Sequence, residues 1–214
     1  MSNIKLVCFD LDDTLIREIH SVMFLCILNG KYEQLLEIEK RELSGELDWI
    51  EADYNKTRLI KGLDETEIQK EFDDILKPLA NIALTADTLR RNNIQSIIIT
   101  AGPKQVAKAA TEKWGFDDYY GSDYEVVDGV FTGEILTHVG DTGKIACLQN
   151  YCNKRGIQSA ECVAVGDGST DIPLFEYCKT SIAVNSSPAV AGKATHYLRT
   201  NDIYEVMQYI IHIT

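Results

Sequence analysis

Hydrophobic residues along the chain gather in short uninterrupted runs, and each run stops abruptly at polar or glycine residues. A run without polar alternation is typical of a strand that is buried on both faces, as in a parallel sheet. We predict four such strands, at residues 5–9, 96–99, 162–165 and 181–184.

The segments between these runs carry helix signals. Residues 104–114 follow Pro103 and precede Gly115, and these residue types are favoured at the start and just past the end of a helix. A second predicted helix covers residues 144–155, and a third covers residues 171–177. This alternation of strands and helices predicts an α/β fold of right-handed βαβ units, with helices on both faces of a parallel sheet.

One long region breaks the alternation. Residues 16–79 show no convincing strand and have the pattern of several amphipathic helices. Asp64 and Glu67 resemble a capping box in front of a helix at residues 68–76. We interpret the region as a helical insert that follows the first strand.

The predicted organisation is therefore a discontinuous core with an inserted domain. The core comprises residues 1–15 and 80–214, and the helical cap domain comprises residues 16–79. A second irregularity lies at residues 124–133, where the dipeptide Asp128-Gly129 between β-prone residues predicts a hairpin.

Composition and charge narrow the function classes. The chain has 214 residues, 45% of them apolar, so it can bury a hydrophobic core. Its net charge of −12 argues against the basic surface that a protein needs to bind nucleic acid or an anionic membrane. The longest apolar run, residues 22–28, is far short of the ~20 residues of a spanning helix. The N-terminal residues show no secretory signal, so we expect a cytoplasmic protein without a nucleic-acid or membrane partner.

The cysteines do not change this picture. None forms a C-x-x-C pair, so a zinc site or disulfide framework is the weaker interpretation and buried thiols in a reducing compartment the stronger one. The six residues are Cys8, Cys26, Cys147, Cys152, Cys162 and Cys178.

Polar residues that can carry chemistry follow three of the four predicted strands. Asp10 and Asp12 come after the first strand, Thr100 after the second, and Asp167 and Asp171 after the third. Ligands bind at the carboxyl ends of strands in an open parallel sheet, and alternate residues that leave a strand project the same way. Convergent carboxylates repel one another unless a cation lies among them. We therefore predict a divalent metal with oxygen ligands, and Mg²⁺ is the natural choice.

A lysine and a hydroxyl complete this pattern. Lys144 is the first residue of the helix that precedes the predicted strand at 162–165. Asp13 and Thr14, in contrast, have a simpler explanation as loop or helix-capping residues. Mg²⁺ beside carboxylates, a lysine and glycine-flanked backbone amides is typical of a phosphate site. An aspartate in such a site can act as a nucleophile and form an aspartyl-phosphate.

These residues resemble the four motifs of the haloacid dehalogenase-like hydrolase superfamily. The motifs here read D-L-D-D-T-L at 10–15, Thr100 after S-I-I-I, Lys144, and G-D-G-S-T-D at 166–171. Within the superfamily the chain is most similar to the phosphoserine phosphatase group, in its helical insert and in the stretch V-V-D-G-V-F-T-G-E at 126–134.

The resemblance implies a Rossmann-like, doubly wound parallel sheet with an inserted helical cap over the site, and a role for each matching residue. Asp10 would be the nucleophile, and Asp12 the acid that protonates the leaving oxygen and then the base that activates water. Thr100 and Lys144 would bind the transferring phosphoryl group. The metal site would comprise Asp10, the backbone carbonyl of Asp12, Asp167 and, in support of the metal shell and of Lys144, Asp171.

The chain departs from the group at several positions. Thr170 replaces the usual Asn, and Thr100-Ala101, followed by Gly102, replaces Ser-Gly. A glutamate that recognises the substrate's amino group in the group falls at Ile19 here, and an arginine that recognises its carboxylate falls at Lys56. One-residue and two-residue slips would give these roles to Glu18 and Arg58, although both residues can equally be solvated helix charges. The expected substrate-binding set is Glu18, Lys56, Arg58, Thr100, Ala101, Gly102, Lys144 and Thr170.

The leading hypothesis is a Mg²⁺-dependent phosphomonoester hydrolase that acts through an aspartyl-phosphate on a small phosphorylated metabolite, with O-phosphoserine as one candidate. A phosphotransferase of the same superfamily shares the first half-reaction and stays open. A phospho-accepting receiver module fits less well. The residue after Ile99 is Thr100 and not an acceptor aspartate, and the insert is large. A non-catalytic binder ranks low because every catalytic position is filled.

Overall fold

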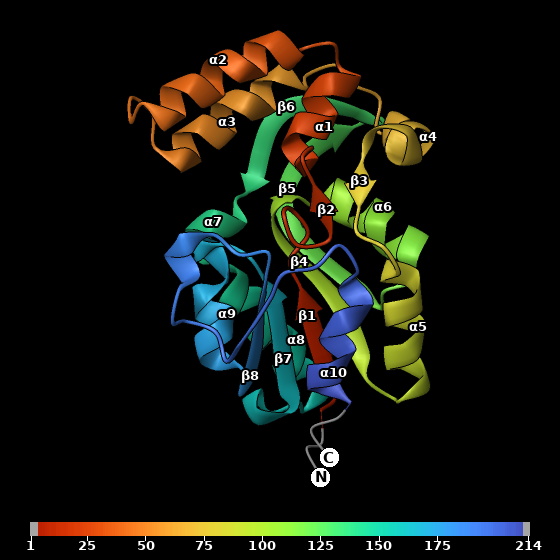
Figure 1. Ribbon diagram of the computed structural model, residues 1–214. Coiled ribbons are helices and arrows are strands. Elements are labelled where there is room, and N and C mark those ends of the chain that lie inside the picture. The colour runs from red at the N-terminus through yellow and green to blue at the C-terminus, as the bar shows by residue number, and fades with distance from the viewer. Residues whose placement is uncertain (1–3, 212–214) are drawn as a thin grey trace.

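The computed structural model describes residues 4–211, and its central element is a seven-stranded sheet (Figure 1). The strand order is β6-β5-β4-β1-β7-β8-β9, parallel except for β6, which pairs antiparallel with β5. The strands are β1 (Leu6–Phe9), β4 (Gln95–Pro103), β5 (Asp118–Val127), β6 (Val130–Thr137), β7 (Cys162–Gly166), β8 (Thr180–Val184) and β9 (His196–Leu198). The α/β fold and the predicted strands are confirmed, and β4 extends past the predicted segment to include Thr100, Ala101 and Gly102.

Helices cover both faces of the sheet, because successive residues of a buried strand point in opposite directions. Val7 and Phe9 of β1 pack in the core under α5 (Ile82–Arg91) and α6 (Lys104–Trp114). Leu6 and Cys8 face the opposite core, which contains residues of α8 (Lys144–Arg155) and α9 (Ile172–Tyr177). The doubly wound arrangement is therefore confirmed. Two short α-helices, α7 (Val139–Thr142) and α10 (Met207–Ile210), also belong to this part of the molecule.

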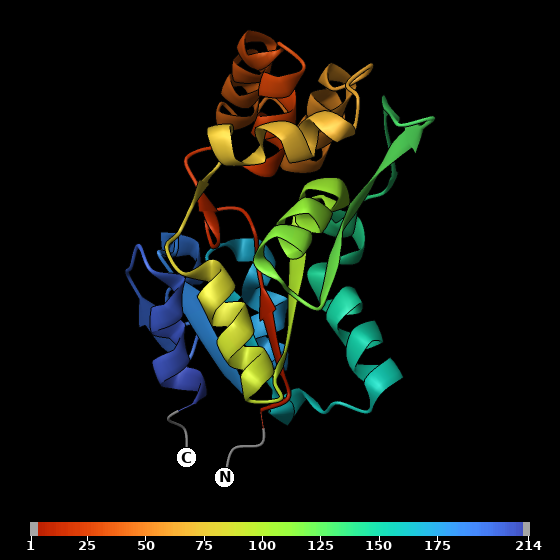
Figure 2. The same cartoon turned by 90° about the vertical axis from the view of Figure 1, so that its right-hand side faces the viewer.

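The region 16–79 lies above the carboxyl ends of the strands, and the start of β1 and the end of α10 lie at the opposite end of the molecule (Figures 1 and 2). It contains α1 (Ser21–Leu28), α2 (Tyr32–Leu43), α3 (Trp49–Leu59) and α4 (Thr66–Ile75). We call these four helices the helical insert.

Two details of this region differ from the prediction. Two short strands, β2 (Ile16–Arg17) and β3 (Lys77–Pro78), pair antiparallel where the chain enters and leaves the helical insert, and two residues are too few to produce a periodic signal. The capping box is also wrong, since α4 begins at Thr66 and the Asp64 carboxylate accepts from the Thr66 amide at 2.8 Å. Glu67 instead pairs with Lys70.

The predicted hairpin is confirmed and reaches up to the helical insert. Asp128 and Gly129 form its turn with φ values of 50° and 81°, the positive angles that a two-residue turn of type I′ requires. Backbone hydrogen bonds join the hairpin to the chain between α3 and α4: Gly62 donates to Phe131 at 2.8 Å, and Phe131 donates to Leu63 at 2.9 Å. The hairpin thus supports the helical insert from the side of the core, as Figure 2 shows.

The described residues also bear on the cysteines and on membrane insertion. All six cysteines are free thiols, and five of them are buried, in keeping with the preferred interpretation. Within residues 4–211, every helix is too short or too polar to cross a bilayer.

The two-faced sheet gives a first prediction. Ile98 of β4 is fully buried, whereas Leu84 of α5 is 47% exposed. Ile98→Ala should lower the free energy of unfolding by about 2–5 kcal/mol, because it removes buried methyl groups and leaves a cavity. Urea unfolding followed by circular dichroism measures this, with Leu84→Ala as the control that should change stability by less than about 1 kcal/mol. Equal losses for both variants would contradict the assignment of the core.

Candidate active site

The chemistry-bearing residues converge at the carboxyl ends of β1, β4 and β7. Asp10 follows β1 directly, and its backbone amide donates to the Val165 carbonyl of β7 at 2.9 Å. Thr100 lies near the end of β4, and Lys144 is the first residue of α8. The side chains of Asp10, Thr100, Lys144 and Asp171 are all buried, so most of the site's charge is shielded from bulk water.

Lys144 connects two of the buried carboxylates. Its ammonium lies 2.6 Å from Oδ1 of Asp10 and 2.7 Å from Oδ1 of Asp171. Burial alone would lower the pKa of Lys144, but the two carboxylates outweigh that effect and raise the pKa above its ordinary value. For Asp10, an acid, burial has the opposite effect and raises the pKa, and the attraction of Lys144 opposes this rise without cancelling it.

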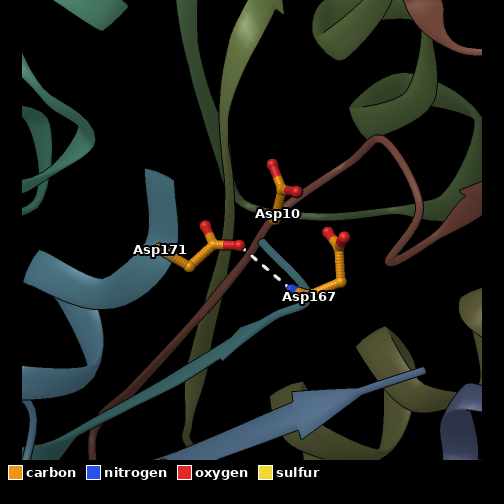
Figure 3. Close-up of side chains that lie close together, drawn as sticks. All are labelled: Asp10, Asp167 and Asp171. Atoms are coloured by element: carbon orange, nitrogen blue, oxygen red, sulfur yellow. Dashed lines mark hydrogen bonds between the residues drawn. The ribbon is translucent and has the colours of Figure 1, made fainter. Parts of the chain in front are cut away.

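Backbone amides hold Asp171 from the other side. Its Oδ2 accepts from the amides of Asp167 at 3.0 Å and Gly168 at 3.1 Å, and Figure 3 shows the first of these bonds. The last residue of β7, Gly166, lies so close to the Asp171 carboxylate that a β-carbon there would collide with it. A glycine is therefore required at 166 for Asp171 to reach Lys144.

Asp10, Asp167 and Asp171 form a cluster that could hold a metal ion. Each offers a carboxylate oxygen, and the three oxygens lie within 4.8 Å of one another (Figure 3). Burial, and then the charge of Asp171, raises the pKa of Asp167 to about 6. A set of oxygen ligands that carries more negative charge than Lys144 balances fits a hard divalent cation.

Thr14 also belongs to this site. Its hydroxyl lies 3.1 Å from Oδ1 of Asp167, and its side chain is fully buried. Asp13 instead pairs with His20 at 3.0 Å near the surface. The simple capping explanation is therefore incomplete for Thr14, which orients a carboxylate of the cluster.

Asp12 faces the helical insert and its carboxylate is not part of the three-carboxylate cluster. The amide and hydroxyl of Ser21, the first residue of α1, each donate to one Asp12 carboxylate oxygen at 2.6 Å. Burial raises the pKa of Asp12, and the bonds from Ser21 oppose that rise. Both side-chain oxygens are thus engaged away from the cluster, so only the backbone carbonyl of Asp12 is left to join a metal shell.

A pocket of about 210 Å³ lies between the helical insert and the strand ends. We call it the insert pocket. An adjoining cavity of about 470 Å³ shares Trp49, Ala101 and Thr170 with it and extends to Lys144. The insert pocket is lined by Asp12, His20, Val22, Met23, Leu35, Glu39, Trp49, Asp53, Lys56, Ala101, Gly102 and Thr170.

Some of the expected substrate-binding residues reach the insert pocket and others do not. Lys56, Ala101, Gly102 and Thr170 line it, and their role in binding a substrate stays a prediction. Arg58 lies two residues beyond Lys56, which places it about 200° around α3. Its guanidinium bonds to Asn55 and lines a separate outer surface cavity.

Glu18 is also outside the insert pocket. It is exposed, and its φ of 68° belongs to the sharp turn that leads from β2 to α1. The neighbouring Ile19 packs against the hydrophobic core.

Sequence reasoning did not identify several residues of the site. Glu39 and Asp53 are single acids in helices rich in acids, so nothing in the sequence distinguishes them from solvated surface charges. Trp49 and His20 carried no motif either. Trp49 is 40% exposed, and the carboxylate of Asp13 raises the pKa of His20 to about 9.

Comparison with known proteins agrees with this geometry. The family model for haloacid dehalogenase-like hydrolases matches residues 7–176. A phosphoserine phosphatase of Streptomyces coelicolor is 28% identical over 98% of this chain, and phosphoserine phosphatase SerB2 of Mycobacterium tuberculosis is 28% identical over 87%. The chain spans only about half the length of these two relatives, 51% and 45%.

A solved structure resembles nearly the whole chain. It is a phospho-aspartyl intermediate analogue of phosphoserine phosphatase, with a TM-score of 0.78 and 25% identity over 97% of this chain and 99% of that one. Because the family model covers most of the sequence and the strand ends carry the expected residues, the chain belongs to the haloacid dehalogenase-like hydrolase family.

Proposed function

We propose that this protein is a Mg²⁺-dependent phosphomonoesterase that transfers a phosphoryl group first to Asp10 and then to water. The observation that carries the proposal is the buried Asp10 carboxylate, held by Lys144 within a cluster of carboxylates beside an open pocket. The substrate is a small phosphorylated metabolite. The relatives named phosphoserine phosphatase support an ester whose leaving group bears an amino group.

Asp10 acts as the nucleophile through its second carboxylate oxygen, since Oδ1 binds Lys144. Attack on phosphorus forms the Asp10–phosphate bond and breaks the ester bond to the leaving oxygen. Asp12 gives its proton to that oxygen. It then takes a proton from water, which attacks the phosphorus, releases phosphate and restores the Asp10 carboxylate.

The surroundings of Asp12 suit this double role. Burial raises its pKa, which favours the protonated form that an acid needs. Its bonds to Ser21 fix the carboxylate at the wall of the insert pocket, where a leaving group would lie. The two proton transfers therefore occur on the side of the phosphoryl group that faces the helical insert.

Thr100 and Lys144 bind the oxygens of the transferring phosphoryl group. The Thr100 hydroxyl oxygen already accepts from the Gly102 amide at 3.0 Å, so its proton is free to be donated to a phosphate oxygen. Lys144 uses two of its three protons on Asp10 and Asp171 and keeps the third for the substrate.

Mg²⁺ would be held by Asp10 and Asp167, with the Asp12 carbonyl as a further ligand and Asp171 in support. Its contribution when bound is to neutralise the charge that develops on the phosphoryl oxygens. Asp171 has both oxygens engaged by Lys144 and backbone amides, and it serves mainly to position Lys144 and the β7 loop.

The proposal is tested by phosphate release from p-nitrophenyl phosphate. The wild-type protein should be active with Mg²⁺ and inactive with a chelator. Asp10→Asn should fall below about 1% of wild-type turnover, because an amide cannot form the acyl phosphate. Its circular dichroism spectrum should match that of the wild type. Substantial turnover by a folded Asp10→Asn variant would contradict the covalent route, and turnover that requires an added alcohol acceptor would favour a phosphotransferase.

Asp12→Asn tests the acid–base role. It should lower turnover of alkyl phosphates by about 10²–10⁴, the usual contribution of a general acid–base group. The first half-reaction of aryl phosphates should suffer much less, because their leaving groups need little protonation. Burst kinetics with p-nitrophenyl phosphate and single turnover of an alkyl ester measure the difference. Equal losses for both esters would exclude Asp12 as the leaving-group acid.

Gly166→Ala tests the position of Asp171. The new methyl group should push the carboxylate away from Lys144 and lower kcat at least about tenfold, since small displacements in an active site are costly. Gly168→Ala is the matched control: its backbone is extended, nothing lies within 4 Å of the added carbon, and its amide remains a donor. We expect near wild-type kcat for the control. A Gly166→Ala variant with unchanged kcat would show that the contact between Asp171 and Lys144 is dispensable.

A further inference from the structure

We propose that the insert pocket selects phosphate esters whose leaving group carries an ammonium group and no carboxylate, that is, amino-alcohol phosphates. This inference rests on the proposed function and specifies its substrate class. It follows from the charges that line the insert pocket, from how those charges are already paired, and from an exposed aromatic side chain at its edge.

The two basic residues of the insert pocket are already paired. Lys56 lies 2.7 Å from Glu42, and His20 lies 3.0 Å from Asp13. Neither of these acidic partners lines the insert pocket. A substrate carboxylate could therefore gain the full charge of Lys56 only if Glu42 were displaced.

The acidic residues of the insert pocket are not balanced in this way. Within residues 4–211, Glu39 has no hydrogen-bonded or ion-paired partner in the structure. Asp53 contacts His138, whose Nε2 lies 3.1 Å from the Asp53 carboxylate. The other ring nitrogen, Nδ1, accepts from the Gly140 amide at 2.9 Å, which leaves Nε2 to donate to Asp53. Asp53 thus receives a hydrogen bond from the ring and, within residues 4–211, makes no ion pair with a lysine or arginine.

Trp49 supplies a second kind of contact for an ammonium group. It lines both the insert pocket and the cavity that leads to Lys144, and 40% of its surface is exposed. Exposed aromatic faces attract cations through the negative face of the ring. Val22, Met23 and Leu35 provide apolar surface for a short carbon chain.

These contacts define the expected ligand. With its phosphate at Asp10 and its leaving oxygen at Asp12, an amino-alcohol ester can extend into the insert pocket and place its ammonium group near Glu39, Asp53 and Trp49. A carboxylate in the same place would meet these two acidic side chains, while both basic residues of the insert pocket are already paired with other acids, and it would be repelled. The volume of about 210 Å³ suits a chain of a few atoms.

The test compares esters of similar size and different charge. Phosphoethanolamine carries an ammonium group, 2-hydroxyethyl phosphate is neutral at that position, phosphoglycolate carries a carboxylate, and O-phosphoserine carries both. We expect kcat/KM for phosphoethanolamine to exceed that for 2-hydroxyethyl phosphate by about tenfold, the effect of one charge-assisted contact. Phosphoglycolate should be the poorest of the four, and O-phosphoserine should fall below phosphoethanolamine.

A variant on α2 assigns this preference to the insert pocket. Glu39→Gln should lower the ratio of kcat/KM between phosphoethanolamine and 2-hydroxyethyl phosphate by about threefold, because Asp53 and Trp49 remain in the insert pocket. Glu37→Gln is the matched control, because Glu37 lies on the same helix but is exposed and outside the insert pocket, and the ratio should stay unchanged.

Two results would overturn the inference: O-phosphoserine or phosphoglycolate as the best of the four esters, or an unchanged ratio in Glu39→Gln. Either result leaves the proposed function intact if p-nitrophenyl phosphate is still cleaved in an Asp10-dependent reaction. Failure to cleave that ester as well would reject the proposed function itself.

Discussion

The structure depends on the burial of charge at the carboxyl ends of β1 and β7. Lys144 and its partners Asp10 and Asp171 are almost completely enclosed, and removing Lys144 would leave two buried carboxylates without their cation, at a cost of several kcal/mol. The neighbouring backbone follows from this requirement. Gly166 leaves room for the Asp171 carboxylate, and two amides of the following loop bind it. The excess of carboxylates is what would let this cluster hold a metal ion.

A second link joins this charged centre to the helical insert. Asp12 leaves β1 with the nucleophile and binds the first residue of α1, so a proposed catalytic group also caps a helix of the insert. The β2–β3 pair and the hairpin hold the helical insert over the strand ends. Under our proposals, the core determines the phosphoryl chemistry and the insert determines the leaving group. The two parts can then vary separately, which is why the family's chemistry alone does not identify the substrate.

Sequence predicted the parts of the molecule that local pattern controls. Buried strands, the helix between Pro103 and Gly115, and the Asp128-Gly129 turn each follow from a few neighbouring residues. The motif residues meet because carboxyl ends of parallel strands meet. The insert pocket was predictable only in part. Lys56 and Arg58 point in different directions from α3, and which of them faces the pocket depends on how α3 packs. The position of Glu39 in the pocket and the pairing of Lys56 with Glu42 both depend on how the helices pack together, and the sequence holds no local signal for that packing.

The most direct test of the account is to identify the residue that becomes phosphorylated. The Asp12→Asn variant, mixed with p-nitrophenyl phosphate and Mg²⁺ and quenched in acid, should accumulate a covalent intermediate, because water attack lacks its base while the aryl leaving group needs no acid. Peptide mapping by mass spectrometry should then find one phosphoryl group, on Asp10. A phosphoryl group on any other residue, or steady turnover with no phosphorylated protein at any quench time, would contradict a mechanism through Asp10.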